Sequence, residues 1–289
     1  MTDITAEWLD LAIPNHTSSS HKFLNGYLTA VVGSSSFPGA ARLSCHAAAR
    51  VGAGGVQVLL PESLRPLIGS FPPEIMPVFT KEHDHTIAPL KAFETFLESS
   101  IRSKAVLIGC GLGRSPGVQE LIKAILSHTQ MPCVIDGDAL YALGKWGRDF
   151  TSRYAKGQWI LTPHRGELNR LRNDLGYADD PLDSSMNTGE ISQMAKDLGV
   201  VIVAKGFPSL IFTPQGDVHL NNTGNPASTT AGCGDVLAGI IAGYLAQGLT
   251  PEKAARIGLH RAGQAADTFI ERTGAHSLMA SDIIEELGR

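Results

Sequence analysis

The stretch NTGNPASTTAGCGDVLAGIIAGYL, residues 222–245, says most about how this 289-residue chain folds. Its first half consists largely of glycine and other small residues, and its uncharged second half predicts a helix that begins near Gly232. Free backbone N–H groups at such a helix start, together with the positive end of the helix dipole, bind anions. Glycine at positions 232 and 234 lets a phosphate approach the backbone closely. The stretch therefore predicts a phosphate-binding loop that leads into a tightly packed helix.

Asp235 is the only ionised side chain between Asn222 and Glu252, and it allows two interpretations. It could be a base that takes a proton from a substrate hydroxyl while the neighbouring loop neutralises a transferred phosphoryl group. It could instead be an aspartate that stabilises the helix N-terminus. Cys233 lies beside it, but phosphate binding needs only the backbone N–H of that residue, so we expect an unreactive thiol.

Outward from this stretch, the chain alternates between apolar runs and helical patterns. Runs that are apolar on both faces are typical of parallel strands covered by helices on each side. The predicted strands are 27–33, 55–61, 104–109, 132–137, 158–163 and 200–206, and the predicted helices include 38–54, 232–247, 251–271 and 279–288. Residues 209–224 predict a β-hairpin. We expect an α/β fold with one domain, 1–289, in which residues 1–25 are an N-terminal extension.

Polar or glycine-rich loops follow five of the predicted strands. Ligands of parallel α/β sheets bind outside the carboxyl ends of the strands, so these loops predict one shared site. They are GSSSFPGAA (33–41), GCGLGRSPG (109–117), DGDAL (136–140), TPHRGE (162–167) and AKGFPS (204–209).

Composition narrows the function further. With 24 basic and 28 acidic residues, the chain has no net positive field to attract nucleic acid or an anionic membrane. Its four cysteines form no C-x-x-C pair or zinc-site spacing, which indicates small buried side chains in a reducing compartment. We see no signal peptide at the N-terminus, and the longest apolar segment, 236–249, is too short to span a membrane. We therefore expect a cytoplasmic protein.

The motifs together resemble a known family. G-x-G-D before a helix is similar to the anion-hole and catalytic-aspartate motif of ribokinase-like proteins, and residues 223–248 resemble the signature of the ADP/ATP-dependent NAD(P)H-hydrate dehydratases within that superfamily. The other matching motifs follow in the family's order, at 31–62, 106–116, 134–140, 161–171 and 204–206. The resemblance covers nearly the whole chain and implies a three-layer αβα sandwich with a mostly parallel central sheet.

This resemblance implies a repair reaction on a damaged cofactor. The S-epimer of NADH or NADPH hydrate (NADHX or NADPHX) is phosphorylated on its ring hydroxyl by ADP or ATP, and elimination of phosphate restores NAD(P)H. Phosphoryl transfer of this kind depends on positioning and charge neutralisation, so Mg²⁺ is an expected cofactor. Members of the family often assemble as homo-oligomers, and a tetramer would fit this sequence. The 25 residues before the first strand are too few for the epimerase domain of bifunctional relatives, so we expect that activity to be absent.

The resemblance also implies roles for individual residues. Asp235 is the implied base, and no residue is expected to bind the metal directly, although Glu167 could order a metal-bound water. The implied hydrate-binding residues are Ala40, Gly113, His164 and Asp235. The implied nucleotide-binding and anion-hole residues are Lys205, Gly206, Phe207, Pro208, Ser209, Asn225, Gly232, Cys233 and Gly234, with Asn225 ordering the loop before the anion hole.

Several of these residues also have purely structural interpretations. His164 and Glu167 could simply start a helix. Asp136 and Asp138 could be turn and cap residues, and Lys205 could be a solvated charge at a strand end. We expect His260 to pack against the sheet.

Three other functions remain open. A small-molecule kinase of the same superfamily, acting on a hydroxymethylpyrimidine or a thiazole alcohol, would share Asp235 and the anion hole. A Rossmann dehydrogenase would use GCGLGR (109–114), but Arg114 occupies the position of the third glycine. A nucleotide sensor without activity would not require Asp235. The sequence departs from the family's usual pattern at Ala227 and Ser228, which leaves the backbone donors of the loop in place.

Overall fold

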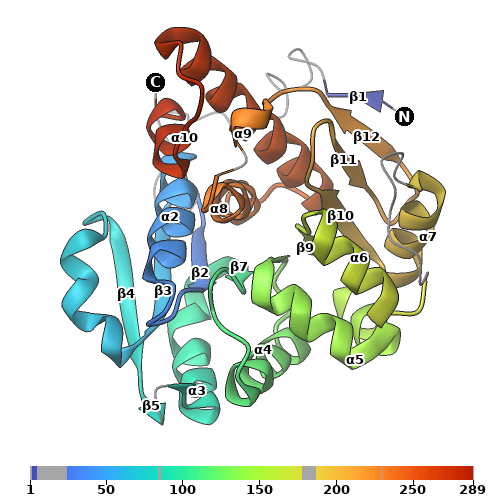
Figure 1. Cartoon of the computed structure of the whole chain (residues 1–289). Coiled ribbons are helices and arrows are strands. Elements are labelled where there is room, and N and C mark those ends of the chain that lie inside the picture. The colour runs from blue at the N-terminus through green and yellow to red at the C-terminus, as the bar shows by residue number, and fades with distance from the viewer. Residues whose placement is uncertain (1, 5–24, 84–85, 178–186, 229, 289) are drawn as a thin grey trace.

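The computed structural model describes residues 2–4, 25–83, 86–177, 187–228 and 230–288. A ten-stranded sheet runs through it, in the order β1-β12-β11-β10-β9-β8-β7-β2-β3-β4 (Figure 1). The strands are β1 (Thr2–Asp3), β2 (Tyr27–Val31), β3 (Gly55–Pro61), β4 (Ile75–Thr80), β7 (Ser103–Ile108), β8 (Cys133–Ile135), β9 (Trp159–Leu161), β10 (Val200–Ala204), β11 (Ser209–Phe212) and β12 (Val218–Asn221). All neighbouring pairs are parallel except β10–β11 and β11–β12. The mostly parallel sheet predicted from the apolar runs is confirmed, as is the hairpin.

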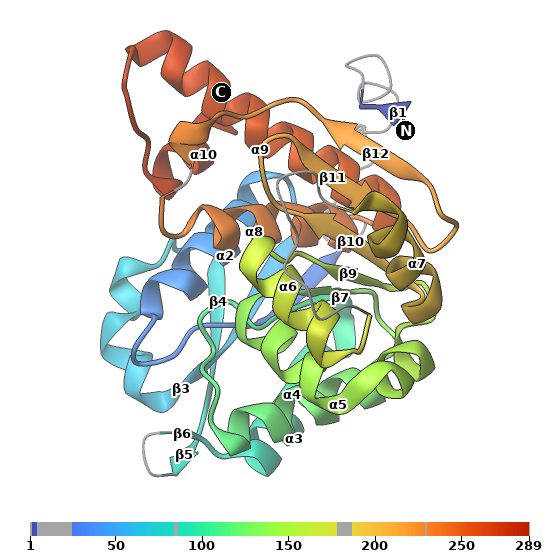
Figure 2. The same ribbon diagram turned by 45° about the vertical axis from the view of Figure 1, so that its right-hand side comes forward.

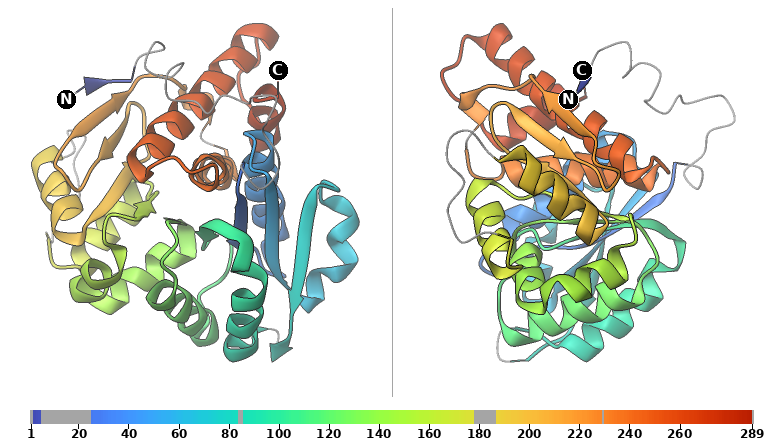
Figure 3. Two further views of the ribbon diagram at one scale, coloured as in Figure 1. Left: turned by 180° about the vertical axis from the view of Figure 1, so that it is seen from behind. Right: turned by 90° about the vertical axis from the view of Figure 1, so that its right-hand side faces the viewer.

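Helices cover both faces of the sheet (Figure 2). One face packs against α2 (Pro38–Arg50), α8 (Cys233–Ala246), α9 (Pro251–Thr273) and α10 (Ala280–Glu286). The other packs against α3 (Pro89–Ser99), α4 (Pro116–His128), α5 (Gly137–Ala155), α6 (Arg165–Asp174) and α7 (Thr188–Leu198). Two separate clusters of buried apolar side chains fill the spaces on either side of the sheet, which makes the three layers seen from behind and from the side in Figure 3.

Small elements complete the chain. The 3₁₀ helices are η1 (Glu62–Ser70), η2 (Ser100–Arg102) and η3 (Pro226–Ser228), and the short strands β5 (Glu82–His83) and β6 (Thr86–Ile87) form a separate pair. Residues 2–4 of the predicted N-terminal extension include β1, which adds to the sheet beside β12. No helix within the described ranges is long and apolar enough to cross a membrane.

The small residues of α8 have a packing reason. A Cβ atom on Gly239 would lie 2.1 Å from the carbonyl oxygen of Ser44 on α2, and one on Gly243 would lie 2.7 Å from that of Ala48. The two helices therefore touch backbone to backbone, and only glycine fits at these contacts. This close contact holds the start of α8 at the sheet edge where the predicted loops meet.

Candidate active site

The loops predicted to share a site do converge at one edge of the sheet. The N–H of Gly33, after β2, donates to the carbonyl of Cys110, after β7, at 2.7 Å. His164, after β9, pairs with Lys205, after β10, in an isolated parallel bridge. Side-chain contacts of Asp136, after β8, complete the connection. The prediction of a common edge is thus confirmed.

The start of α8 faces the ammonium group of Lys205. Gly232 caps the helix with a φ of 91°, in the left-handed region that favours glycine. A Cβ on Gly234 would lie 3.2 Å from Nζ of Lys205. Backbone N–H groups, the helix dipole and one cation therefore meet at the same place, which suits a phosphate.

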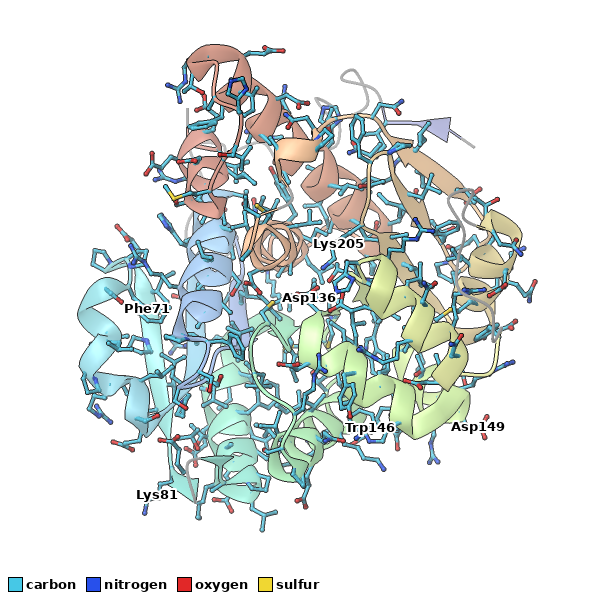
Figure 4. The ribbon with its side chains drawn as sticks, viewed as in Figure 1. Phe71, Lys81, Asp136, Trp146, Asp149 and Lys205 are labelled. Carbon is cyan, nitrogen blue, oxygen red and sulfur yellow. The ribbon has the colours of Figure 1, made fainter. Side chains whose placement is uncertain are left out.

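Asp136 is buried at the centre of the site, with an exposed fraction of 4% (Figure 4). Its Oδ1 accepts hydrogen bonds from Oγ1 of Thr162 at 2.7 Å and from Nζ of Lys205 at 3.0 Å. Its Oδ2 accepts a weaker one from the Cys110 thiol at 3.4 Å. Asp136 is the N-cap residue of α5, as its structural interpretation predicted, but its side chain forms no capping hydrogen bond and instead contacts Thr162, Lys205 and Cys110.

Lys205 is largely buried, with 16% of its side chain exposed, and the interpretation as a solvated charge is also wrong. Besides Asp136, it lies 3.9 Å from Oε2 of Glu167. Burial alone would lower the pKa of Lys205, but the carboxylates of Asp136 and Glu167 outweigh it, so the pKa is raised. The ammonium group therefore stays charged and points at the helix start.

Asp235 lies in the first turn of α8, half-buried and close to the carboxylate of Asp136 and the thiol of Cys110. One ligand atom each of Asp235, Asp136 and Cys110 lie within 4.8 Å of one another. Burial, and then the charge of Asp136, raise the pKa of Asp235 to about 6, against the opposing effect of Lys205. A carboxylate whose pKa lies near neutrality can accept a proton and release it again, as a general base must. Gly232 is the N-cap residue, but Asp235 lies in the first turn, where a negative charge stabilises the helix start, so the structural interpretation holds beside the catalytic one.

His164 and Glu167 form the helix start that the structural interpretation predicted. Nδ1 of His164 accepts from the N–H groups of Gly166 at 3.0 Å and Glu167 at 3.3 Å, and Oε2 of Glu167 accepts from the N–H of His164 at 2.8 Å. This capping box fixes both side chains at the start of α6. The imidazole of His164 remains 62% exposed, so the cap does not prevent it from facing a ligand.

A cavity of about 470 Å³ lies between the β10–β12 strands, α8, α9 and α10. It brings together His164 and seven of the nine residues implied for the nucleotide: Lys205, Gly206, Phe207, Ser209, Asn225, Cys233 and Gly234. Pro208 and Gly232 lie between these residues in the chain without lining the cavity. Its apolar wall includes Leu237, Leu259 and Ile283, which the motifs did not single out.

Ala40, in the first turn of α2, and Gly113, in the loop after β7, lie outside this cavity. A Cβ on Gly111 would lie 2.7 Å from that of Ala40, so the 109–114 loop packs directly on the start of α2. The N–H of Gly113 donates to Oδ2 of Asp138 at 2.8 Å, and Nε of Arg114 donates to Oδ1 at 2.7 Å. Asp138 therefore holds this loop in place.

Asp267 on α9 is a site residue that the sequence reasoning missed. Its carboxylate accepts from the N–H of Gly224 at 2.7 Å and from Nδ2 of Asn225 at 3.0 Å. Oδ1 of Asn225 in turn accepts from the N–H of Ala227 at 2.9 Å. The loop before the anion hole is thus tied to α9. Asp267 follows two alanines inside a helical pattern, and nothing local predicts that it reaches a loop 42 residues away in sequence.

The remaining predicted groups lie as follows. Cys45, Cys110 and Cys133 are buried and Cys233 is half-buried, and all four are free thiols, as expected. Burial lowers the pKa of His260, which lies half-buried on α9; its contact with the sheet stays a prediction.

Comparison with known proteins identifies relatives of this chain. The chain is 35% identical over 286 residues to a bifunctional NAD(P)H-hydrate repair enzyme of Moorella thermoacetica, covering 98% of this chain and 52% of that protein. It is 32% identical to the ADP-dependent (S)-NAD(P)H-hydrate dehydratase of Bacillus subtilis, over 99% of this chain and 96% of the relative. The chain spans about half the length of the first curated relatives it matches.

Solved structures agree with these sequence relatives. The ADP/ATP-dependent NAD(P)H-hydrate dehydratase of B. subtilis, co-crystallised with ATP and Mg²⁺, superposes with a TM-score of 0.79 at 28% identity, over 99% of this chain and 96% of the other. Other solved members of the ribokinase-like superfamily align over most of the chain, which confirms the predicted fold. A sequence model described as NAD(P)H-hydrate dehydratase matches residues 28–289, which include every loop of the site, so the chain belongs to the NAD(P)H-hydrate dehydratase family.

Proposed function

We propose that this protein dehydrates the S-epimer of NADH or NADPH hydrate back to NAD(P)H, at the expense of ADP or ATP. The phosphoryl group is transferred to the ring hydroxyl. The C–O bond then breaks to release inorganic phosphate, and loss of a proton from the adjacent ring carbon restores the ring double bond. ADP leaves as AMP, or ATP as ADP. The names of the relatives support this reaction, and so does the chemistry of the site.

The observation that carries the proposal is the place of Asp235. The pKa of Asp235 is raised to about 6, chiefly by burial. The residue also lies in the first turn of α8, where the backbone amides and the ammonium group of Lys205 are directed at the same expected phosphate position. A base beside an anion-binding group is the arrangement needed to deprotonate a hydroxyl as it receives a phosphoryl group.

The residues divide into three roles in this proposal. Asp235 takes the proton of the ring hydroxyl. Gly232, Cys233 and Gly234 donate backbone N–H groups to the transferred phosphoryl, and Lys205 neutralises its charge. The nucleotide occupies the cavity lined by Gly206, Phe207 and Ser209, with Pro208 between them in the chain and Asn225 ordering the loop. Ala40, Gly113 and His164 contact the hydrate.

Mg²⁺ would enter with the nucleotide phosphates. The one described group of three potential metal ligands contains the Cys110 thiol, and a hard cation prefers oxygen ligands. The carboxylate of Asp136 is also already occupied by Lys205 and Thr162. The side chains therefore fit an ion held mainly by phosphate oxygens and water, with Glu167 as a partner through water. When bound, the ion would neutralise phosphate charge.

The described residues act as one domain in this proposal. The protein forms a homo-oligomer; the exposed apolar side chains of Leu90 on α3 and Ile101 on η2 are compatible with contacts between copies. Its expected cytoplasmic location stays a prediction. Light scattering coupled to size exclusion measures the assembly, and a monomer at micromolar concentration would contradict it.

The decisive experiment incubates the purified protein with hydrated NADH, Mg²⁺ and either ADP or ATP, and follows the returning absorbance of reduced nicotinamide. We expect recovery that requires nucleotide and falls about 10²-fold or more in Asp235→Asn, since general-base help is lost. Asp149→Asn, an exposed carboxylate far from the site in Figure 4, is the matched control. Near-native turnover in Asp235→Asn would refute the assigned role.

Other outcomes would indicate the alternatives. ATP consumption with a pyrimidine or thiazole alcohol, without recovery of NADH, would establish the kinase. Nucleotide binding with neither reaction would establish the sensor. The dehydrogenase is disfavoured by the contacts of Asp136 and Asp138, which are engaged with Lys205 and with the 109–114 loop.

A further inference from the structure

A cluster of three cations surrounds one aromatic ring beside the expected hydrate pocket. The guanidinium carbon of Arg114 lies 4.5 Å from the centre of the Tyr141 ring, Nζ of Lys145 lies 4.5 Å from it, and the guanidinium carbon of Arg170 lies 5.1 Å from it. They come from three elements: the loop after β7, α5 and α6. We call this group the Tyr141 cluster. It stands out in a chain whose net charge is -4.

The charge of the Tyr141 cluster is only partly neutralised. Arg114 pairs with Asp138 through Nε at 2.7 Å, and half of its side chain stays exposed. Nε and Nη2 of Arg170 are buried and have no hydrogen-bond partner among the described residues. Lys145 is exposed and forms no ion pair within the part of the chain that the structure describes, although Asp174 lies nearby against Gly144. Like charges gathered at one place repel each other unless an anion binds between them.

The position of the cluster connects it to the proposed reaction. Asp138 binds both Arg114 and the N–H of Gly113, and Tyr141 follows Asp138 by three residues on the same face of α5. Arg170 follows Glu167 by three residues on α6, the helix that begins at His164. α5 and α6 pack side by side (Figures 1 and 2). The cluster therefore adjoins Gly113, which is expected to contact the hydrate, and Arg170 lies on the helix whose N-cap is His164, about 9 Å further along its axis.

We propose that the Tyr141 cluster binds a phosphate group of the dinucleotide hydrate, and so holds the substrate at a point away from the reacting ring. This inference rests on the proposed function. A dinucleotide hydrate carries a pyrophosphate, and the NADPH form carries an additional 2′-phosphate, so either could be the bound group. Guanidinium groups bind phosphate through paired N–H donors, and the half-exposed guanidinium of Arg114 is accessible for this. The buried guanidinium of Arg170 adds positive charge behind it, and the exposed Lys145 adds a further cation. The ring of Tyr141 holds the three cations together before the phosphate arrives.

The test measures binding of NADPH and NADH, the reduced products, through their intrinsic fluorescence, which does not depend on turnover. The variants are Lys145→Gln and Arg170→Gln, with Arg170→Lys to keep the charge but lose the paired donors. Arg153→Gln, an exposed arginine near the other end of α5, is the matched control. Circular dichroism and thermal melting verify that each variant is folded.

We expect Kd to rise about tenfold or more in Lys145→Gln and Arg170→Gln, the scale of a lost hydrogen bond to a charged group, and to stay unchanged in Arg153→Gln. An effect confined to NADPH assigns the cluster to the 2′-phosphate, and an equal effect on both assigns it to the pyrophosphate. Unchanged Kd in both cluster variants, or no binding of either product to the wild type, overturns the proposal.

KM for the hydrates should change in the same direction as Kd. A wild type that binds NADPH but never turns over a hydrate would refute the proposed function, while the Kd comparison would still decide whether the cluster binds phosphate.

Discussion

At the scale of single residues, Asp136 controls the two groups on which the proposed chemistry depends. Its charge raises the pKa of Asp235, and its Oδ1 holds Lys205 at 3.0 Å. In the wild type, activity should rise with pH through about 6 as Asp235 loses its proton. In Asp136→Asn, the repulsion disappears and the pKa of Asp235 falls, so this acid limb should move to lower pH. The pH profile of kcat/KM measures the shift.

Asp136→Glu provides the control for that prediction, because it keeps the charge while moving the carboxylate. The acid limb should then stay closer to that of the wild type even if the overall rate is lower. An acid limb that is unchanged in Asp136→Asn would show that Asp235 is not the titrating base, or that Asp136 does not act on it.

The raised pKa of Asp235 also has a consequence for stability. Because its folded-state value is about 6 against an ordinary 3.8, the folded protein holds the proton more tightly than the unfolded chain does. Stability therefore decreases as pH rises through this window. Asp235→Asn removes the ionised form, so it should raise the Tm above that of the wild type at pH 7.5, with the difference vanishing near pH 3.8 and below. Melting curves of both proteins across this range test it. A Tm lower than that of the wild type at pH 7.5 would contradict the assignment of burial as the main cause.

At the scale of elements, the contact between α2 and α8 should be intolerant of a single methyl group. Gly239→Ala improves intrinsic helix propensity by about 1 kcal/mol. Its Cβ, however, would lie 2.1 Å from the Ser44 carbonyl oxygen, so the helices must separate. We expect a net loss of about 1–3 kcal/mol in the free energy of unfolding, the usual range for overpacking. Denaturant unfolding measures it.

Gly39→Ala in α2 is the matched control, because a Cβ at that position meets nothing within 4 Å. It should leave stability unchanged or slightly increased. If both substitutions behaved alike, the close contact between α2 and α8 would be wrong, and with it the reason why this helix consists of small residues.

The elements also show what local sequence can predict. The strands and the start of α8 could be predicted from local sequence. An apolar run indicates a buried strand, and a Gly-x-Gly segment indicates a tight helix start, without reference to distant residues. The role of Asp136 could not be predicted in the same way: its partners, Thr162 and Lys205, lie 26 and 69 residues away in sequence. The same holds for Asp267, whose contact with Asn225 exists only after α9 has packed. His164 is a helix-start residue, as its structural interpretation predicted, and its side chain also lines the cavity. Its contact with the hydrate stays a prediction.

At the scale of the whole molecule, the layered parallel fold followed from the alternation of apolar runs and helices, but the edges of the sheet did not. β4 contains Pro77, which is tolerated at an edge strand and weakens the strand pattern in sequence. β1 has only two residues, too few to form a pattern, and it is specified by β12, more than 200 residues later. The edge strands of the sheet form only through pairing with distant strands, whereas the central strands are specified by their own apolar residues, which are buried on both faces.

Nucleotide binding should stabilise the molecule as a unit, because the cavity is lined by the β10–β12 strands, α8, α9 and α10. Ligand at about 100 times its Kd adds about 2.7 kcal/mol to the free energy of unfolding. For a chain of this size that amounts to a Tm increase of about 5 °C with saturating ADP or ATP. In Gly234→Val, the Cβ alone would lie 3.2 Å from Nζ of Lys205, and the two methyl groups would fill the space in front of the helix start. A phosphate could then no longer approach the backbone amides. The Tm increase should then be lost, whereas Asp235→Asn, which keeps both the amides and Lys205, should retain it. A full Tm increase in Gly234→Val would place the phosphates elsewhere and remove the start of α8 from the binding site.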